Sequence, residues 1–183
     1  MATDGAQLKK FILIAADEQE FEVEEAVAME FGIVKTYFED NPDTCDEPIP
    51  LPNVESKYLS KVIEYCRWHL DHKARKPAKP LPKYKFLQSE GEEDSEAEAF
   101  DRELFNSLDN EGMRQMVLAA NYLDVKDLLE MMVQAVANKL ANKSVEYVRR
   151  FFEIENDYTP EEEAELRKQN EWAFEDVDPD DDI

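Results

Sequence analysis

Three side chains near the middle of the chain have a spacing that resembles a metal site. Cys66, His69 and His72 follow one another at intervals of three residues, and the chain has no other histidine. On a helix, residues three apart share a face but residues six apart do not, so the three side chains would converge only if the helix ended early. Cys66 also continues an apolar stripe, which favours a place in the core over a zinc site.

Acidic residues are the remaining candidates for catalysis. Glu161, Glu162 and Glu163 lie at an expected helix start, where they complement the helix dipole instead of occupying an apolar pocket that would raise a pKa. Four glycines leave little scope for a phosphate-binding loop. The sequence therefore predicts a protein that is not an enzyme and has no cofactor. A carboxylate mechanism that uses neither histidine nor cysteine remains as an alternative.

The composition predicts one folding unit with extensions. The 183 residues include 44 acidic and 21 basic side chains, a formal net charge of -23. This charge repels nucleic-acid phosphates and anionic membranes, so we expect neither as a partner, although acidic excess also simply confers solubility. Two cysteines are too few for a disulfide scaffold, and Met1 to Lys10 lack the apolar stretch of a secretory signal. We expect a location in the cytoplasm and nucleus.

The N-terminal pattern predicts a β-hairpin. Residues 10–15 form a short apolar run, and the polar residues 17–19 interrupt it. Phe21 and Val23 then alternate with acidic residues, as in a strand with one buried face.

Short helices, an edge strand and a long helix are expected next. Residues 24–40 fit two helices because Gly32 interrupts the pattern. The prolines in 48–52 restrict that segment to an edge strand. Asn53 is predicted to cap an amphipathic helix whose core face carries Leu59, Val62, Ile63, Cys66 and Leu70.

Residues 73–99 are predicted to be a flexible charged insert. The segment is basic and contains proline in its first half, and it is acidic in its second half. The basic half could be a nuclear-import signal or a phosphate-binding patch, but a solvated linker accounts for it better.

The rest of the chain reads as helices with clear starts. A helix over 116–123 is expected to end at Asp124, which is predicted to be the N-cap of a second helix with an apolar stripe over 129–140. Ser144 is the expected cap of a third helix. Residues 159–162 combine a hydroxyl cap, proline at the first helical position and a glutamate three residues after the cap, which predicts the start of the last helix.

The last helix has little apolar surface. Only Ala164 and Leu166 are apolar between residues 161 and 170, yet Trp172 follows directly in an acidic stretch. A tryptophan in such a place either anchors a partner or folds back onto the third helix. The pattern alone leaves both interpretations open.

Six blocks of residues occur in order along nearly the whole chain. The blocks are Phe21-Glu22-Val23-Glu24-Glu25-Ala26-Val27-Ala28, Pro50-Leu51-Pro52-Asn53-Val54, Lys61-Val62-Ile63-Glu64-Tyr65-Cys66, Leu118-Ala119-Ala120-Asn121-Tyr122-Leu123-Asp124-Val125-Lys126-Asp127-Leu128-Leu129, Asn156-Asp157-Tyr158-Thr159-Pro160-Glu161-Glu162-Glu163 and Arg167-Lys168-Gln169-Asn170-Glu171-Trp172-Ala173-Phe174. As a series they resemble the Skp family, which joins F-box proteins to a cullin scaffold in ubiquitin ligases. The early and final blocks are most similar to plant members.

The resemblance implies an α+β BTB/POZ fold with a C-terminal helical extension. The expected units are the BTB/POZ domain at 8–72 and 100–140, the insert at 73–99, an F-box-binding extension at 141–174 and an acidic tail at 175–183.

The resemblance also implies two binding faces on a non-catalytic adaptor of an SCF-type ubiquitin ligase. The N-terminal domain of a cullin would bind Asn121 and Tyr122, with Tyr37 and Phe38 in the corresponding early helix, unless Tyr122 is core and Asn121 a cap. F-box proteins would bind Val136, Leu140, Phe152, Ile154 and Trp172, to which the helical stripes add Leu129, Met132, Val133 and Val148. A RING subunit and a ubiquitin-conjugating enzyme would be indirect partners.

Two departures from the family pattern leave alternatives open. Phe100-Asp101 stands where the family usually has tryptophan-aspartate, and Met113-Arg114-Gln115 replaces a leucine-phenylalanine-glutamate helix opening. A divergent adaptor that holds F-box proteins but binds cullin weakly is one alternative. Independently of these departures, the chain could be an elongin-C-like adaptor for another box motif, or an F-box partner that works outside ubiquitin transfer. The net charge and the acidic stretch 178–182 suggest a further alternative, an acidic chaperone of basic proteins such as histones.

Overall fold

A small mixed sheet forms the N-terminal edge of the molecule. The structure is a computed structural model, and it describes residues 9–40, 47–75, 96–175 and 177–179. Strand β1 (Lys10–Ala15) pairs antiparallel with β2 (Glu20–Glu24) and parallel with β3 (Ile49–Leu51), so the strand order is β2-β1-β3. The predicted hairpin and the predicted proline-bearing edge strand are both confirmed.

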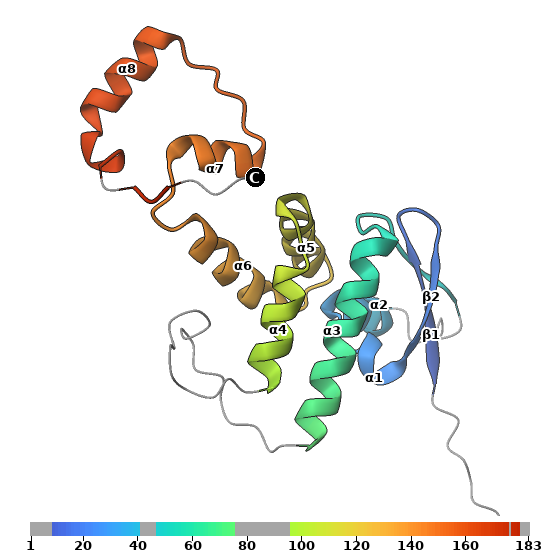
Figure 1. Ribbon diagram of the computed structural model, residues 1–183. Helices are drawn as coiled ribbons and strands as arrows, with labels where there is room; N and C mark the ends of the chain where they lie inside the picture. The colour runs from blue at the N-terminus through green and yellow to red at the C-terminus, as the bar shows by residue number, and fades with distance from the viewer. Residues whose placement is uncertain (1–8, 41–46, 76–95, 176, 180–183) are drawn as a thin grey trace, which may run out of the picture.

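The sheet buries one face against the first helices. Phe11, Leu13 and Ala15 of β1 are buried, whereas Lys10 is exposed, as the two-residue period of a strand requires. Helix α1 (Glu25–Ala28) and helix α3 (Ser56–Arg75) lie against this face, with α2 (Gly32–Asp40) beside them (Figure 1). The prediction of two short helices is confirmed, but the break lies at residues 29–31 and Gly32 begins α2.

The predicted cap of α3 is wrong. The helix begins at Ser56, three residues after Asn53. The backbone N–H and the hydroxyl of Ser56 donate to the carboxylate of Asp17, at 3.2 and 2.5 Å. Asp17 lies in the β1–β2 turn, so the acceptor that satisfies the helix start comes from 39 residues earlier in the chain.

The predicted insert is narrower than 73–99. Helix α3 continues to Arg75 and helix α4 (Glu96–Asn106) begins at Glu96, so both ends of the predicted segment are helical. The remainder of the predicted insert lies outside the described residues, as does Cys45. Helix α5 (Asn110–Tyr122) follows, with Asp109 as its N-cap accepting from the Gly112 N–H at 2.7 Å.

The turn between α5 and α6 (Lys126–Leu140) differs from the prediction at its cap. Helix α5 ends before Asp124 as expected, but the N-cap position of α6 is Val125, and no side chain caps this helix. Asp124 instead has a left-handed backbone, with φ 53°. Its side chain does not cap α6 and lies instead beside Gly32 of α2.

Two later helix starts follow the sequence prediction. Ser144 caps α7 (Val145–Phe152) by accepting from the Tyr147 N–H at 3.0 Å. Thr159 caps α8 (Pro160–Gln169) in a reciprocal capping box with Glu162. A short 3-10 helix, η1 (Glu171–Ala173), carries Trp172.

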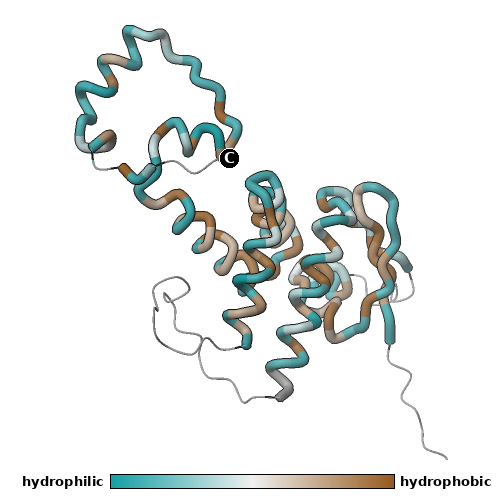
Figure 2. The backbone as a smooth tube through the Cα atoms, in the orientation of Figure 1, coloured by the Kyte–Doolittle hydropathy of each residue, from teal (hydrophilic) through white to brown (hydrophobic). Residues whose placement is uncertain are grey.

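The last helices extend away from the sheet. We call the sheet with helices α1 to α5 the first lobe, and the helices from α6 onward the C-terminal lobe. Helix α6 extends away from the first lobe, and α7 and α8 lie on opposite sides of an open ring of chain (Figure 1). Apolar residues concentrate in the first lobe, and α8 is mostly hydrophilic (Figure 2). The tail returns to the α6–α7 turn, where the Asp178 N–H donates to the Asn142 carbonyl at 2.8 Å. No helix of the described ranges has both the length and the apolar character needed to cross a membrane.

Candidate functional site

Trp172 is the most exposed large hydrophobic residue in the part of the chain that the structure describes. Its exposed fraction is 77%, which excludes packing onto the third helix, α7. Of the two interpretations that the sequence left open, the structure therefore favours a side chain presented to solvent. Large aromatic residues at such positions commonly anchor interfaces.

Further apolar side chains are exposed on the same C-terminal lobe. Val133 of α6 is 50% exposed, and Phe152 and Ile154 at the end of α7 are 43% and 56% exposed. Leu166 of α8, at 36%, was not among the predicted contact residues. We call these four residues and Trp172 the extension surface.

The other predicted F-box contacts lie deeper. Leu129, Val136, Leu140 and Val148 are half-buried. Met132 is fully buried in the core and offers no surface, so its inclusion was wrong. The inward face of α6 is the row Leu128, Met132 and Ala135, and the predicted stripe was too wide because it spanned both this row and the outward Val133.

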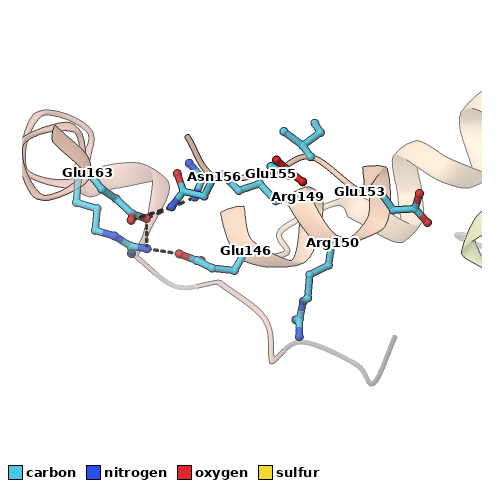
Figure 3. A pocket seen from close by; sticks show the side chains of 9 residues that line it. Glu146, Arg149, Arg150, Glu153, Glu155, Asn156 and Glu163 are labelled. Atoms are coloured by element: carbon cyan, nitrogen blue, oxygen red, sulfur yellow. Dashed lines mark hydrogen bonds and ion pairs between the residues drawn. The ribbon is translucent and has the colours of Figure 1, made fainter. Parts of the chain in front are cut away.

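A group of polar and charged side chains joins α7 to α8 (Figure 3). We call this group the charge clip, and its members are Glu146, Arg149, Asn156, Glu163 and Arg167. The carboxylate of Glu163 accepts hydrogen bonds from Asn156 at 3.0 Å, Arg167 at 3.1 Å and Arg149 at 3.4 Å. Arg167 also pairs with Glu146 of α7. The Asn156 amide, followed by the Arg167 guanidinium, lowers the pKa of Glu163 below its ordinary value. These residues line an open hollow of about 840 Å³.

Arg114 connects the two lobes. Its guanidinium donates to the backbone carbonyl of Phe151 and pairs with Glu153, which ends α7 in a left-handed conformation with φ 55°. The carbonyl of Phe151 is one of the groups that a helix end leaves without an intrahelical partner. The departure from the family pattern at Met113-Arg114-Gln115 therefore supplies an interlobe contact through Arg114, while Met113 is buried in the core.

The second candidate surface lies where α5 ends beside α2. Asn121 is exposed, whereas Tyr122, Tyr37 and Phe38 are half-buried and Phe38 packs against Phe11 at 4.6 Å between ring centroids. Asn121 is not the cap of α5, because the C-cap of this helix is Leu123. Tyr122 does pack partly against the core.

Leu118 is the residue of this second surface that the sequence analysis missed. It is 58% exposed and lies three and four residues before Asn121 and Tyr122 on α5, so it shares their face of the helix. Its helical spacing from that pair was the available signal.

A close contact between α2 and the α5–α6 turn sets this surface. The Ile33 N–H donates to the carbonyl of Leu123 at 3.4 Å. A Cβ added to Gly32 would lie 2.6 Å from the Cβ of Asp124, closer than side chains tolerate. Glycine at position 32 and the left-handed Asp124 together allow α2 to approach the end of α5.

The two histidines join α3 to α4. His69 lies 2.7 Å from Asp101, and His72 lies 3.2 Å from Glu96. Trp68 stacks between His72, at 3.5 Å, and Phe100, at 4.4 Å between ring centroids. The other departure from the family pattern, Phe100-Asp101, thus packs α4 onto α3. Cys66 is buried, and within the described ranges no three histidine, cysteine or acidic side chains are grouped to hold a metal ion.

Comparison with known proteins identifies both lobes. A family model described as "Skp1 family, tetramerisation domain" matches residues 9–71, and one described as "Skp1 family, dimerisation domain" matches residues 126–173. The second match begins with α6, whereas the expected boundary of the extension lay after residue 140.

Curated relatives match over nearly the full length. SKP1-like protein 1A of Arabidopsis thaliana is 42% identical over 91% of this chain and 98% of its own. SKP1-like protein 1 of Oryza sativa subsp. japonica is 42% identical over 96% of this chain and 100% of its own. The SCF ubiquitin ligase complex protein SKP1a of Dictyostelium discoideum is 41% identical over 88% of this chain and 93% of its own.

The chain belongs to the Skp1 family. Residues 9–71 of the first lobe match the POZ domain of that family, and the helices from α6 to η1 match its C-terminal domain, so the α+β prediction is confirmed. Family membership also identifies the chain as a non-catalytic adaptor subunit.

Proposed function

We propose that this Skp1-family protein is the adaptor of an SCF-type ubiquitin ligase, bridging F-box proteins to the N-terminal domain of a cullin. The observation that carries the proposal is the exposure of the extension surface, above all the 77% exposure of Trp172, in a member of this family. The complex that we propose is the one in the name of the Dictyostelium relative, an SCF ubiquitin ligase complex protein.

An F-box protein is the proposed occupant of the extension surface. Helix α8 buries none of its residues, so its apolar side chains stay available to a partner. An amphipathic segment of a partner would cover Leu166 and Trp172 together with Phe152 and Ile154. Burial of an aromatic side chain of this size is typical of an interface hot spot.

The cullin is proposed to bind the second surface, with Asn121, Tyr122, Tyr37 and Leu118 as contacts. The exposed Leu118 adds apolar area beside the exposed Asn121. This surface lies on the first lobe and the extension surface lies on the C-terminal lobe, so we expect both partners to bind at once. The adaptor then acts by proximity: it raises the effective concentration of an F-box-bound substrate near the ubiquitin carrier that the ligase recruits.

The test is binding of an F-box protein and of a cullin N-terminal domain, measured separately by calorimetry. Trp172→Ala is expected to lower F-box affinity at least about tenfold and to leave cullin binding unchanged. The double variant Asn121→Lys/Tyr122→Lys is expected to abolish cullin binding alone. Ile12→Ala is the matched control, because Ile12 is an exposed apolar residue of β1 outside both surfaces.

Each failure has a distinct meaning. If the wild-type chain binds the F-box protein but not the cullin, the bridging role is wrong and the chain is a divergent F-box-binding protein. If it binds neither, the proposed function is refuted.

A further inference from the structure

Helix α8 is attached to its own lobe without a fully buried apolar side chain. None of its residues is buried, yet it leads directly into η1 and Trp172. An isolated helix of ten residues is marginal in water, so its position depends on tertiary contacts. The polar contacts of the charge clip are therefore central to the placement of Trp172.

The clip connects α8 to α7 and to the segment between them. Glu163 accepts hydrogen bonds from Arg149 of α7 and from Asn156 of the connecting segment. Arg167 donates a hydrogen bond to Glu146 of α7. Arg167 thus donates to both Glu163 and Glu146, and Figure 3 labels these two carboxylates. Two side chains of α8, one turn apart, thus contact the neighbouring elements.

Arg167 also contacts Phe174, which lies two residues after Trp172. Its guanidinium carbon lies 4.5 Å from the centre of the Phe174 ring, a cation–π distance. The Phe174 N–H closes η1 by donating to the Glu171 carbonyl at 2.9 Å. Arg167 is therefore joined both to α7 and to the residue two positions after Trp172.

We propose that the charge clip holds Trp172 in place in the free chain, with Arg167 as the positioning residue, so that an F-box protein meets a preorganised anchor. This rests on the proposed function for the identity of the partner. Preorganisation improves affinity because less conformational freedom is lost on binding. A single exposed ion pair contributes little, so the joint effect of the network is required.

Salt dependence follows from the same geometry. The clip residues are partly solvent-exposed, and their mutual attraction is screened as ionic strength rises. The turn that carries Trp172 is expected to gain mobility in 1 M salt even though the tryptophan itself is uncharged.

The first measurement is the time-resolved fluorescence anisotropy of Trp172 in the free chain. A Trp68→Phe background leaves Trp172 as the only tryptophan. Arg167→Glu is expected to increase the fast motion of Trp172, and Lys168→Glu, the same charge change at the next and exposed residue, is expected not to. The swap Glu146→Arg with Arg167→Glu restores an opposite-charge pair and is expected to restore the slow decay.

The second measurement is affinity for an F-box protein with the same variants. Arg167→Glu is expected to weaken binding about tenfold, Lys168→Glu to leave it within about twofold, and the swap to recover most of the loss. Recovery distinguishes positioning from direct contact, because a partner that touched Arg167 itself would not accept the swapped charge.

Three outcomes overturn the inference. An Arg167→Glu chain with unchanged anisotropy refutes positioning. Increased mobility with unchanged affinity shows that the partner does not use the preorganised turn, and lost affinity without recovery in the swap assigns Arg167 to direct contact. A wild-type chain that binds no F-box protein refutes the proposed function, while the anisotropy series still decides whether the clip positions Trp172.

Discussion

Replacing Gly32 with alanine tests the contact that brings α2 to the end of α5. Helix propensity alone would favour alanine by about 1 kcal/mol or less at this first helical position. The added Cβ, however, would lie 2.6 Å from both the Cβ and the Cγ of Asp124. These atoms are close to the backbone, so the helix or the turn must move to accept the change.

The expected net effect is destabilisation. Overpacking of this kind costs about 1–3 kcal/mol, and the propensity gain offsets part of it, which leaves a loss of about 1–2 kcal/mol in the free energy of unfolding. For a chain of this size that corresponds to a fall in Tm of about 2–8 °C. Urea unfolding should show a lower midpoint with an unchanged slope.

A second variant identifies the cause. Asp124→Gly removes the obstructing side chain, and glycine suits the φ of 53° at that position. In the Asp124→Gly background, Gly32→Ala is expected to cost little, so the two changes should be strongly non-additive. The reasoning fails if Gly32→Ala raises the midpoint, or if it costs the same in both backgrounds.

Other predictions concern the C-terminal lobe. Trp172→Ala should change the free energy of unfolding by no more than about 0.5 kcal/mol by urea titration, because the side chain is 77% exposed. Met132→Ala should cost about 2–5 kcal/mol since Met132 is fully buried, and its neighbour Val133→Ala should cost far less in the same assay. The pKa of Glu163 is lowered, so its stabilising contribution to the clip is fully present above the ordinary value of 4.5 and is lost as the pH falls below it through the lowered pKa. The chemical shift of the Glu163 carboxyl carbon should show this acid step. The Arg149 and Arg167 side-chain N–H shifts should follow the same step, and Glu163→Gln should remove it from them, whereas the separate step of Glu162 at the helix cap should persist.

The sequence predicts well those features whose cause is local. Ser144 and Thr159 cap their helices with acceptors that lie within three residues of the donors they satisfy. The β1–β2 hairpin follows from an alternation contained within fifteen residues. The prolines of 48–52 were enough to predict an edge strand.

The sequence predicts poorly those features that depend on distant partners. Asn53 had the right residue type for a cap, but Asp17 supplies the acceptor at Ser56 from another turn. Asp124 likewise had the right type, but it adopts a left-handed conformation and packs against α2. A helical stripe does not say how wide the buried face is, which is why Met132 was assigned to the surface.

The sequence could not decide whether Trp172 is exposed, for a related reason. Whether a polar helix folds back depends on contacts such as those of Arg167 with α7, which no local pattern encodes. The resemblance to the Skp family supplied the division into two binding faces. The structure supplied Leu118 and Leu166 as further exposed residues of those faces.

The order β2-β1-β3 also affects how the protein behaves when concentrated. The edge strand β2 alternates Glu20, Glu22 and Glu24 along one face, and the other edge strand carries Pro50, which has no N–H to donate. A second copy that added its β2 strand to this edge would bring two rows of carboxylates together. Strand-to-strand aggregation is thereby opposed at both edges of this sheet.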